Sequence, residues 1–334
     1  MNAAEISSAI AKALGGPLAL DVATLAALLS LEDVGAWAEI KAAAREIKSR
    51  LGKSDTLLRG LIETSNICQK DCLYCGIRRS NAAVVRYRLD ERTIAACVEE
   101  AVRRGYPAVA FQSGELEGDE NTAFFERVLS SLPSGLEVTL SLGEQMEDVY
   151  RRWKDAAGER TIRYLLRIES SDRNVFAAIH PGGYSFDRRL GCIRALKRLG
   201  YVTGSGVMIG LPGQNMEMLA RDIVFFGEER LDMVGMGPFI PAPNTPMGDA
   251  VPAFTEARRV EMTLRMIALA RLYLHSVNIV SATALEALGG VEARQAGLDA
   301  GANVVMPVLT PAECRCRYSL YPAGRQTEVT IGEL

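Results

Sequence analysis

The feature that most constrains the fold is a regular alternation of short apolar runs with longer charged segments. The apolar runs have strand length, and the charged segments repeat with the 3.6-residue period of amphipathic helices. This alternation predicts βαβ units and a parallel sheet. The expected strands are Leu57–Ile62, Ala108–Gln112, Glu137–Leu142, Arg163–Ile168, Thr203–Ile209, Asp232–Met236, Asn278–Ser281 and Asn303–Met306. The expected helices include Glu91–Arg104, Gln145–Ala157, Arg188–Leu199, Met216–Glu229 and Glu256–Leu274.

Eight strands over about 250 residues predict an α/β fold, a complete (βα)8 TIM barrel. Residues 1–50 differ, because Ala23–Leu31 and Trp37–Ile47 place apolar groups at helical spacing. We therefore expect an N-terminal helical extension, 1–50, followed by the barrel, 51–334. No Pro-rich linker, low-complexity tract or long repeat divides the barrel segment.

Polar or glycine-rich residues follow most of the expected strands. They stand directly after the first five strands and the seventh, at positions 63–66, 112–115, 141–144, 169–171, 210–214 and 283. Barrel enzymes carry their chemistry on the C-terminal ends of the strands. The sequence therefore predicts an active site at that end of the barrel.

Composition excludes several classes of partner. The net charge of −3 shows no electrostatic footprint for nucleic acid. No run of 18 or more apolar residues is present, so no membrane span is expected. Glu5, Lys12 and Asp21 interrupt the apolar positions near the N-terminus, which is unlike a signal peptide. We therefore expect a cytoplasmic protein.

The seven cysteines are odd in number and unevenly spaced, which disfavours a disulfide framework. Three of them form a C-x3-C-x2-C triplet, Cys68, Cys72 and Cys75, directly after the first strand. Because cytosolic thiols stay reduced, metal binding or catalysis is the favoured use of such a triplet. Structural zinc would require a fourth ligand, and the two histidines, His180 and His275, are distant in sequence.

Thiolates are the usual ligands of iron–sulfur clusters. Three of them on one loop can hold three corners of a 4Fe–4S cluster and leave the fourth iron without a protein ligand. S-adenosylmethionine (SAM) can fill that position with its amino and carboxylate groups. One electron from the cluster would then break a C–S bond of SAM and give a 5′-deoxyadenosyl radical, which the barrel orients and shields.

At these residues the chain resembles the radical SAM superfamily, in which the C-x3-C-x2-C motif follows the first barrel strand. An aromatic residue precedes the third cysteine there, as Tyr74 does here. Further stretches resemble the HydE family of radical SAM maturases, which help to build the diiron subcluster of FeFe-hydrogenase. These stretches are 72–79, 112–115, 139–144, 164–169, 210–214, 232–241 and 302–307.

The resemblance implies a role in assembly of the diiron cofactor. It implies an organometallic or other small-molecule substrate, a reductant such as ferredoxin or flavodoxin, and other hydrogenase maturases as partners. The alternative is a radical SAM enzyme acting on a small organic molecule, as methylornithine synthase and biotin synthase do. A non-catalytic metal-binding barrel is a third, less favoured hypothesis.

The chain departs from the usual HydE pattern at several strand ends. It has Ile-Glu-Ser-Ser at 168–171, Pro-Val-Leu-Thr-Pro at 307–311 and Pro-Ala-Pro-Asn-Thr-Pro at 241–246, where HydE proteins commonly carry other residues. Many HydE proteins also carry a second cysteine triplet near the C-terminus, which this chain lacks. The pair Cys314 and Cys316 is expected not to bind a cluster, since two thiols cannot supply its ligands.

The resemblance also implies which residues form the site. Cys68, Cys72 and Cys75 are expected to be the catalytic residues and the ligands of the 4Fe–4S cluster. Residues 112–115, Gln-Ser-Gly-Glu, match a motif whose backbone meets the amino group of SAM. A glycine there permits close approach of the backbone.

Charged residues complete the expected SAM site. Arg189 matches an arginine that pairs with the SAM carboxylate, and Arg167 and Glu169 match a pair near the amino acid moiety. Met233 matches a residue near the adenosine, and Tyr321 a tyrosine over the cavity. The full set of expected cofactor-binding residues is Tyr74, Gln112, Ser113, Gly114, Glu115, Ser141, Arg167, Glu169, Arg189, Met208, Met233 and Tyr321.

Overall fold

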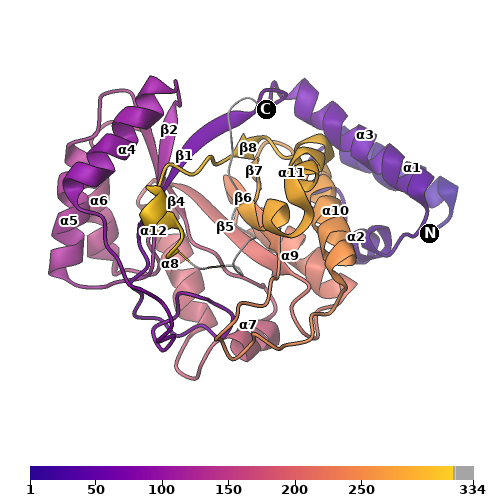
Figure 1. Ribbon diagram of the computed structural model, residues 1–334. Helices are drawn as coiled ribbons and strands as arrows, with labels where there is room; N and C mark the ends of the chain where they lie inside the picture. The colour runs from indigo at the N-terminus through magenta and orange to yellow at the C-terminus, as the bar shows by residue number, and fades with distance from the viewer. Residues whose placement is uncertain (319, 321–334) are drawn as a thin grey trace.

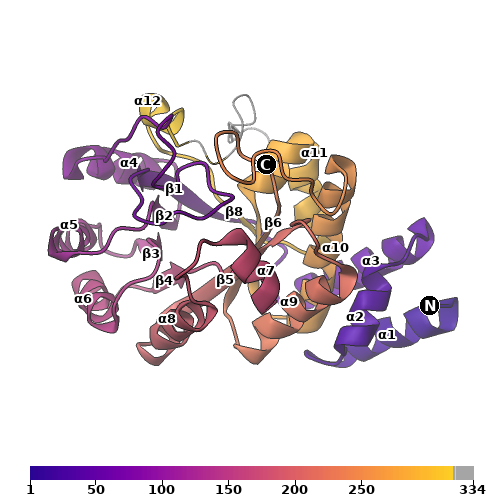
Figure 2. The ribbon, with the colours of Figure 1, turned by 90° about the horizontal axis from the view of Figure 1, so that it is seen from below.

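The computed structural model describes residues 1–318 and 320, and its centre is a closed barrel of eight parallel strands (Figures 1 and 2). The strands follow one another around the barrel in sequence order, and pairing of β1 with β8 closes it. This confirms the predicted (βα)8 barrel. The strands are β1 (Leu57–Ser65), β2 (Ala108–Ser113), β3 (Glu137–Ser141), β4 (Ile162–Leu165), β5 (Val202–Ile209), β6 (Met233–Pro238), β7 (Asn278–Ser281) and β8 (Val304–Val305).

Strand β4 ends three residues before its prediction. The apolar run Arg163–Ile168 predicts a longer strand, but the ladder stops at Leu165. The backbone N–H of Ile168 donates to the hydroxyl of Ser205 instead of to a carbonyl of β5, and pairing with β5 resumes only at Glu169. A side-chain acceptor has therefore replaced one rung of the sheet, which an apolar pattern cannot reveal.

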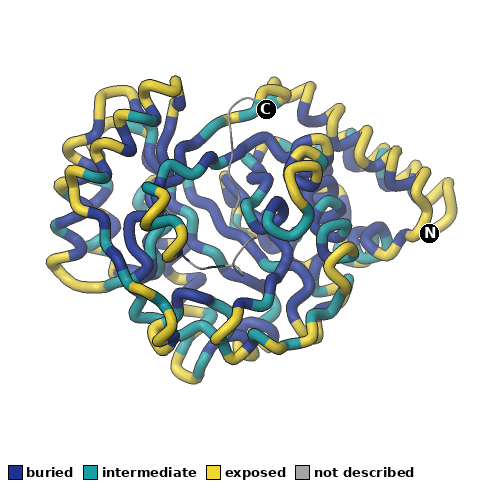
Figure 3. The backbone as a smooth tube through the Cα atoms, viewed as in Figure 1, coloured by how far each residue is buried: buried dark blue, intermediate teal, exposed yellow. Residues whose placement is uncertain are grey.

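Helices cover the outside of the barrel, and three more precede it. Their exposed faces are outward and their buried faces line the sheet (Figure 3). Helices α5 and α11 lie where no helix was singled out from the sequence. The helices are α1 (Ala3–Gly15), α2 (Val22–Leu29), α3 (Val34–Arg50), α4 (Glu91–Arg103), α5 (Asp119–Ser130), α6 (Glu147–Ala157), α7 (Arg173–Ile179), α8 (Phe186–Arg198), α9 (Met216–Glu228), α10 (Glu256–Leu274), α11 (Thr283–Ala300) and α12 (Ala312–Arg315).

The N-terminal helices pack on one side of the barrel. Helix α2 contacts α9, while α3 contacts α10 and α11. Leu25 and Ile40, which are fully buried, belong to the same apolar core as the barrel residue Ile267. The helical extension is therefore present, whereas a domain boundary at residue 50 stays a prediction. No helix in the described part of the chain is long and apolar enough to cross a membrane.

A buried arginine of α10, Arg271, connects this helix to the N-terminal ends of two barrel strands. Arg271 is completely buried, and its guanidinium donates to the carbonyls of Gly301 at 3.0 Å and Val277 at 2.8 Å and to Oδ1 of Asn303 at 3.0 Å. Burial lowers the pKa of Arg271 to about 10, so the group stays charged at neutral pH. The end of α10 is thereby tied to the starts of β7 and β8.

Replacing Arg271 with Met should destabilise the fold, because several buried acceptors would lose their donor. Each unsatisfied acceptor costs about 1–3 kcal/mol, so we expect the free energy of unfolding to fall by about 3 kcal/mol or more. Urea unfolding followed by circular dichroism measures this. The control, Arg221→Met, removes an exposed arginine that pairs with Glu217 on α9 and should change stability by less than about 0.5 kcal/mol. Equal losses in the two variants would contradict the role given to Arg271.

Candidate active site

The three cysteines of the triplet lie in the loop between β1 and α4, at the C-terminal end of the barrel. Their thiols are free and half-buried. The loop has little regular structure, and one side chain holds much of it together. Arg86 donates to the carbonyls of Asn66 at 2.7 Å, Ile77 at 2.8 Å and Arg78 at 2.6 Å.

The end of β2 touches this loop at Gly114. A Cβ atom on Gly114 would lie 2.2 Å from the carbonyl oxygen of Ile67 and 2.8 Å from Cβ of Cys68, so only glycine fits. Directly after it, the backbone N–H of Glu115 points at Sγ of Cys68 at 3.3 Å. The N–H of Lys70 reaches the same sulfur at 3.4 Å. Burial raises the pKa of the Cys68 thiol, and these two donors counteract part of that rise.

Burial keeps the thiols of Cys72 and Cys75 protonated when no metal is bound. Burial raises the pKa of Cys72 to about 12 and also raises the pKa of Cys75. Binding of a metal by these residues would therefore have to release protons from neutral thiols. Within residues 1–318, no group of three or more His, Cys, Asp or Glu side chains surrounds a single ion position. Three separate soft donors on one loop fit the corners of a cubane.

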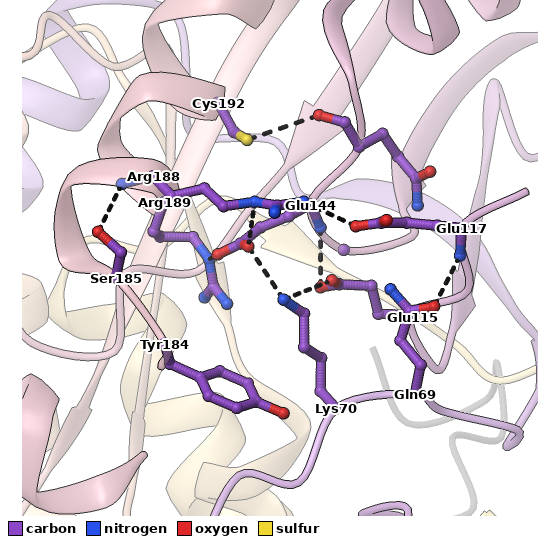
Figure 4. Close-up of polar contacts among 12 residues, drawn as sticks. Gln69, Lys70, Glu115, Glu117, Glu144, Tyr184, Ser185, Arg188, Arg189 and Cys192 are labelled. Carbon is purple, nitrogen blue, oxygen red and sulfur yellow. Dashed lines mark hydrogen bonds and ion pairs between the residues drawn. The ribbon is translucent and has the colours of Figure 1, made fainter. Parts of the chain in front are cut away.

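A buried network of charges lies beside the loop (Figure 4). The ammonium group of Lys70 contacts carboxylate oxygens of Glu115 and Glu144, each at 3.1 Å. Arg189 donates from Nε to Glu144 at 2.5 Å, and Nε of Arg188 lies 3.3 Å from the same carboxylate. Segments that follow β1, β2 and β3 thus meet helix α8 at one point.

Gly143 allows the side chain of Glu115 to approach the backbone at Glu144. Its φ of +82° is unfavourable for other residues, and a Cβ atom there would lie 2.3 Å from Cγ of Glu115. The carboxylate of Glu115 can therefore accept the backbone N–H of Glu144 at 2.8 Å.

The end of β4 carries a second ion pair, between a partly exposed Arg167 and a buried Glu169. Nε of Arg167 lies 3.0 Å from both carboxylate oxygens of Glu169, and its other nitrogens donate to the carbonyls of Gly235 and Val207. The hydroxyl of Tyr74, from the cysteine loop, lies 3.4 Å from the Glu169 carboxylate. Glu169 has a φ of +66°, which is rare for a side chain of this size and indicates local strain.

Four other expected site residues lie on strands β2, β3 and β5. Gln112 donates to the hydroxyl of Tyr318 at 3.1 Å, and Met208 packs in an apolar cluster with Tyr74. Ser113 Oγ donates to its neighbour's carbonyl at 2.7 Å, and Ser141 ends β3.

One expected residue, Met233, lies away from the cysteine loop. Met233 stands at the start of β6, where its sulfur contacts Arg59 Nη1 at 3.2 Å, so the structure does not bring it beside the cysteine loop. Tyr321 lies outside the described residues.

Sequence reasoning did not single out Lys70, Arg188 or Glu144. A lysine between two cysteines was a usable signal, and Glu144 belongs to a polar run at the end of a strand. Their convergence depends on how α8 packs against the loop after β3. No spacing within the sequence encodes that packing.

Asp222 of α9 anchors the turn that follows Glu169. It is fully buried, and its Oδ1 accepts the backbone N–H of Ser171 at 2.6 Å and the Ser171 hydroxyl at 2.7 Å. Its Oδ2 has no hydrogen-bond partner within the described chain. Burial raises the pKa of Asp222 from 3.8 to about 7.

This raised pKa makes stability depend on pH. Between about pH 4 and pH 7 the folded state retains a proton that the unfolded state has lost, so stability falls as pH rises through this window. Asp222→Asn keeps the Oδ1 acceptor and should flatten the fall, which can be measured as the free energy of unfolding from pH 5 to pH 8. Asp187→Asn, which alters an exposed aspartate, should leave the slope unchanged. Parallel profiles for wild type and Asp222→Asn would contradict the assignment.

Comparisons with known proteins show the family to which this chain belongs. The radical SAM superfamily model matches residues 62–226. The [FeFe] hydrogenase maturase subunit HydE of Thermotoga maritima is 40% identical over 297 residues, covering 88% of this chain and 82% of that protein. The 3-methylornithine synthase of Methanosarcina barkeri is 26% identical over 291 residues, covering 86% and 79% respectively.

Solved structures agree on the fold. The crystal structure of methylornithine synthase superimposes with a TM-score of 0.77 at 23% identity, covering 96% of this chain and 88% of that chain. That of the hydrogenase maturase HydG gives 0.81 at 18% identity, covering 98% and 73%. The chain belongs to the HydE family of the radical SAM superfamily, and its cofactors are a 4Fe–4S cluster and SAM.

Proposed function

We propose that this protein is a HydE-type maturase, a radical SAM enzyme that acts in assembly of the diiron cofactor of FeFe-hydrogenase. The observation that carries the proposal is 40% identity to the Thermotoga HydE across 88% of the chain. The cysteine loop at the C-terminal end of a closed barrel supports the same chemistry, because barrel enzymes react at that end.

The proposal assigns the cluster to Cys68, Cys72 and Cys75. When bound, the cluster supplies the electron that cleaves SAM to the 5′-deoxyadenosyl radical. The chain contributes the soft donors, and the two N–H groups at the sulfur of Cys68 offset part of the effect of burial, which raises the pKa of this thiol. Leu73 and Tyr74 belong to an apolar cluster beside the thiols, which limits access of water.

SAM is assigned to the polar groups that face this loop from β2, β4 and α8. Arg189 is buried and held charged by Glu144, which raises the pKa of the guanidinium against the effect of burial. It therefore offers a desolvated cation for the SAM carboxylate. Arg167 and Glu169 would border the amino acid moiety, and the glycine at 114 would let the backbone approach the SAM amino group.

An enzyme of the methylornithine synthase or biotin synthase kind is the second candidate. It is favoured by the departures from the HydE pattern at 168–171, 241–246 and 307–311, which border the site end of the barrel. Likeness to methylornithine synthase at 26% identity covers nearly as much of the chain. Lysine-dependent consumption of SAM would favour this candidate over a maturase.

The proposal also names partners of the reaction. Cleavage of SAM needs a one-electron reductant, for which we infer a ferredoxin or flavodoxin. Other hydrogenase maturases would supply or receive the organometallic substrate. Free thiols at all seven cysteines suit a reducing, cytoplasmic compartment.

Restoration of hydrogenase activity tests the proposed function directly. A host that carries FeFe-hydrogenase but lacks its own HydE should regain hydrogen evolution when this gene is supplied. A Cys72→Ser gene is the matched negative control. Failure of the wild-type gene, with the protein present and loaded with iron, would contradict the maturase role and leave the second candidate.

Replacement of one thiolate should remove the cluster and leave the barrel intact. Because Cys72 lies on a loop, Cys72→Ser should not change the far-ultraviolet circular dichroism. Iron and sulfide content after anaerobic reconstitution should fall sharply, and formation of 5′-deoxyadenosine should cease. Cys316→Ser, at an exposed cysteine outside the triplet, serves as the control and should behave as wild type. SAM cleavage by the Cys72→Ser protein would overturn the ligand assignment.

Loss of the buried arginine should weaken SAM binding. Arg189→Ala removes a charge-assisted contact worth about 1.5–3 kcal/mol, equivalent to a Kd about 10- to 150-fold higher. Equilibrium dialysis on the reconstituted protein measures it. Arg194→Ala, on the same helix but exposed and paired with Glu229, should leave the Kd unchanged. An unchanged Kd in Arg189→Ala would remove this residue from the site.

A further inference from the structure

Glu144 is the buried centre of the charge network beside the cysteine loop (Figure 4). Its side chain is 4% exposed, and three cationic groups reach its carboxylate. Lys70 approaches to 3.1 Å, Arg188 to 3.3 Å and Arg189 to 2.5 Å. Lys70 comes from the cysteine loop, whereas the two arginines come from the first turn of α8.

The network keeps this carboxylate ionised although it is buried. Burial by itself raises the pKa of Glu144, but Arg189 and Lys70 outweigh that effect and hold the pKa below its ordinary value. A buried charge fixed by several partners has little freedom to move. Removing its charge would leave the buried Arg189 without this carboxylate partner, which is costly in a desolvated site, whereas Lys70 would keep its contact with Glu115.

The position of Glu144 connects the two halves of the proposed site. Lys70 lies between Cys68 and Cys72, so its contact ties the cysteine loop to the end of β3. Arg189 uses Nε for Glu144 and Nη1 for the carbonyl of Arg167, which fixes the plane of its guanidinium. The Glu144 carboxylate thus links the cysteine loop, through Lys70, to Arg189, the cation assigned to the carboxylate of SAM.

We propose that Glu144 is a positioning residue that aligns Arg189 with the cysteine loop for SAM binding, without contacting SAM itself. The inference rests on the proposed SAM site and adds to it a residue that acts through another. Arg189 alone, on a long side chain, would lose more rotamer freedom on binding SAM. Preorganisation by Glu144 reduces that cost and so tightens binding.

The test is a double-mutant cycle on anaerobically reconstituted protein. Wild type, Glu144→Gln, Arg189→Ala and the double variant are compared for iron content and for the Kd of SAM. Glu144→Gln should raise the Kd about tenfold in the wild-type background. In the Arg189→Ala background the same change should alter the Kd less than twofold, because the residue through which Glu144 acts is gone. Glu117→Gln, at the exposed carboxylate that also pairs with Arg188, is the control and should bind SAM as wild type does.

The outcomes separate this inference from the proposed function. If wild type neither binds SAM nor releases 5′-deoxyadenosine, the proposed function fails. If wild type binds SAM but Glu144→Gln has the same effect in both backgrounds, or none in either, only the inference is overturned. Should Glu144→Gln bind less iron, the cycle is repeated with Lys70→Met added to all four proteins. This change removes the loop cation, which in Glu144→Gln would retain its contact with Glu115 but lose the one with Glu144. Additive effects in that series would equally contradict the role of Glu144.

Discussion

The contact between the end of β2 and the cysteine loop is the interaction on which the site depends. Backbone hydrogen bonds form turns within the loop, and others join it to neighbouring segments at Gln69 and Leu73. Gly114 allows the two backbones to touch, and the N–H that follows it reaches the sulfur of Cys68. Arg86 then fixes the far part of the loop through its carbonyls. The thiols are therefore positioned by a barrel strand, although they are carried on irregular chain.

Buried ion pairs surround this loop, and their value lies in geometry more than in stability. The pair Arg189–Glu144 is desolvated on both sides, whereas Arg167 remains partly exposed beside a buried Glu169, and the net contribution of both pairs to folding is expected to be small. They hold charged groups at fixed positions where water screens them less than at the surface. A cofactor that carries a carboxylate, an ammonium and a sulfonium group is suited to such surroundings.

Much of the fold was predictable from the sequence, because strand-length apolar runs and helical periodicity report directly on a parallel barrel. The end of β4 was not, since a serine hydroxyl replaces a backbone acceptor there. The cysteine loop and the polar strand ends were also predictable. Met233 was expected near the site, but it starts its strand and so lies at the other end of the barrel. Lys70 and Glu144 were missed because their proximity is a product of tertiary packing.

The central claim is that three protein thiolates leave one iron of the cluster for SAM. Electron–nuclear double resonance on the reduced, reconstituted wild-type protein tests it most directly. SAM carrying ¹⁵N in its amino group or ¹⁷O in its carboxylate should give hyperfine coupling to the cluster with either label. A full complement of iron with no coupling from either label would contradict the account.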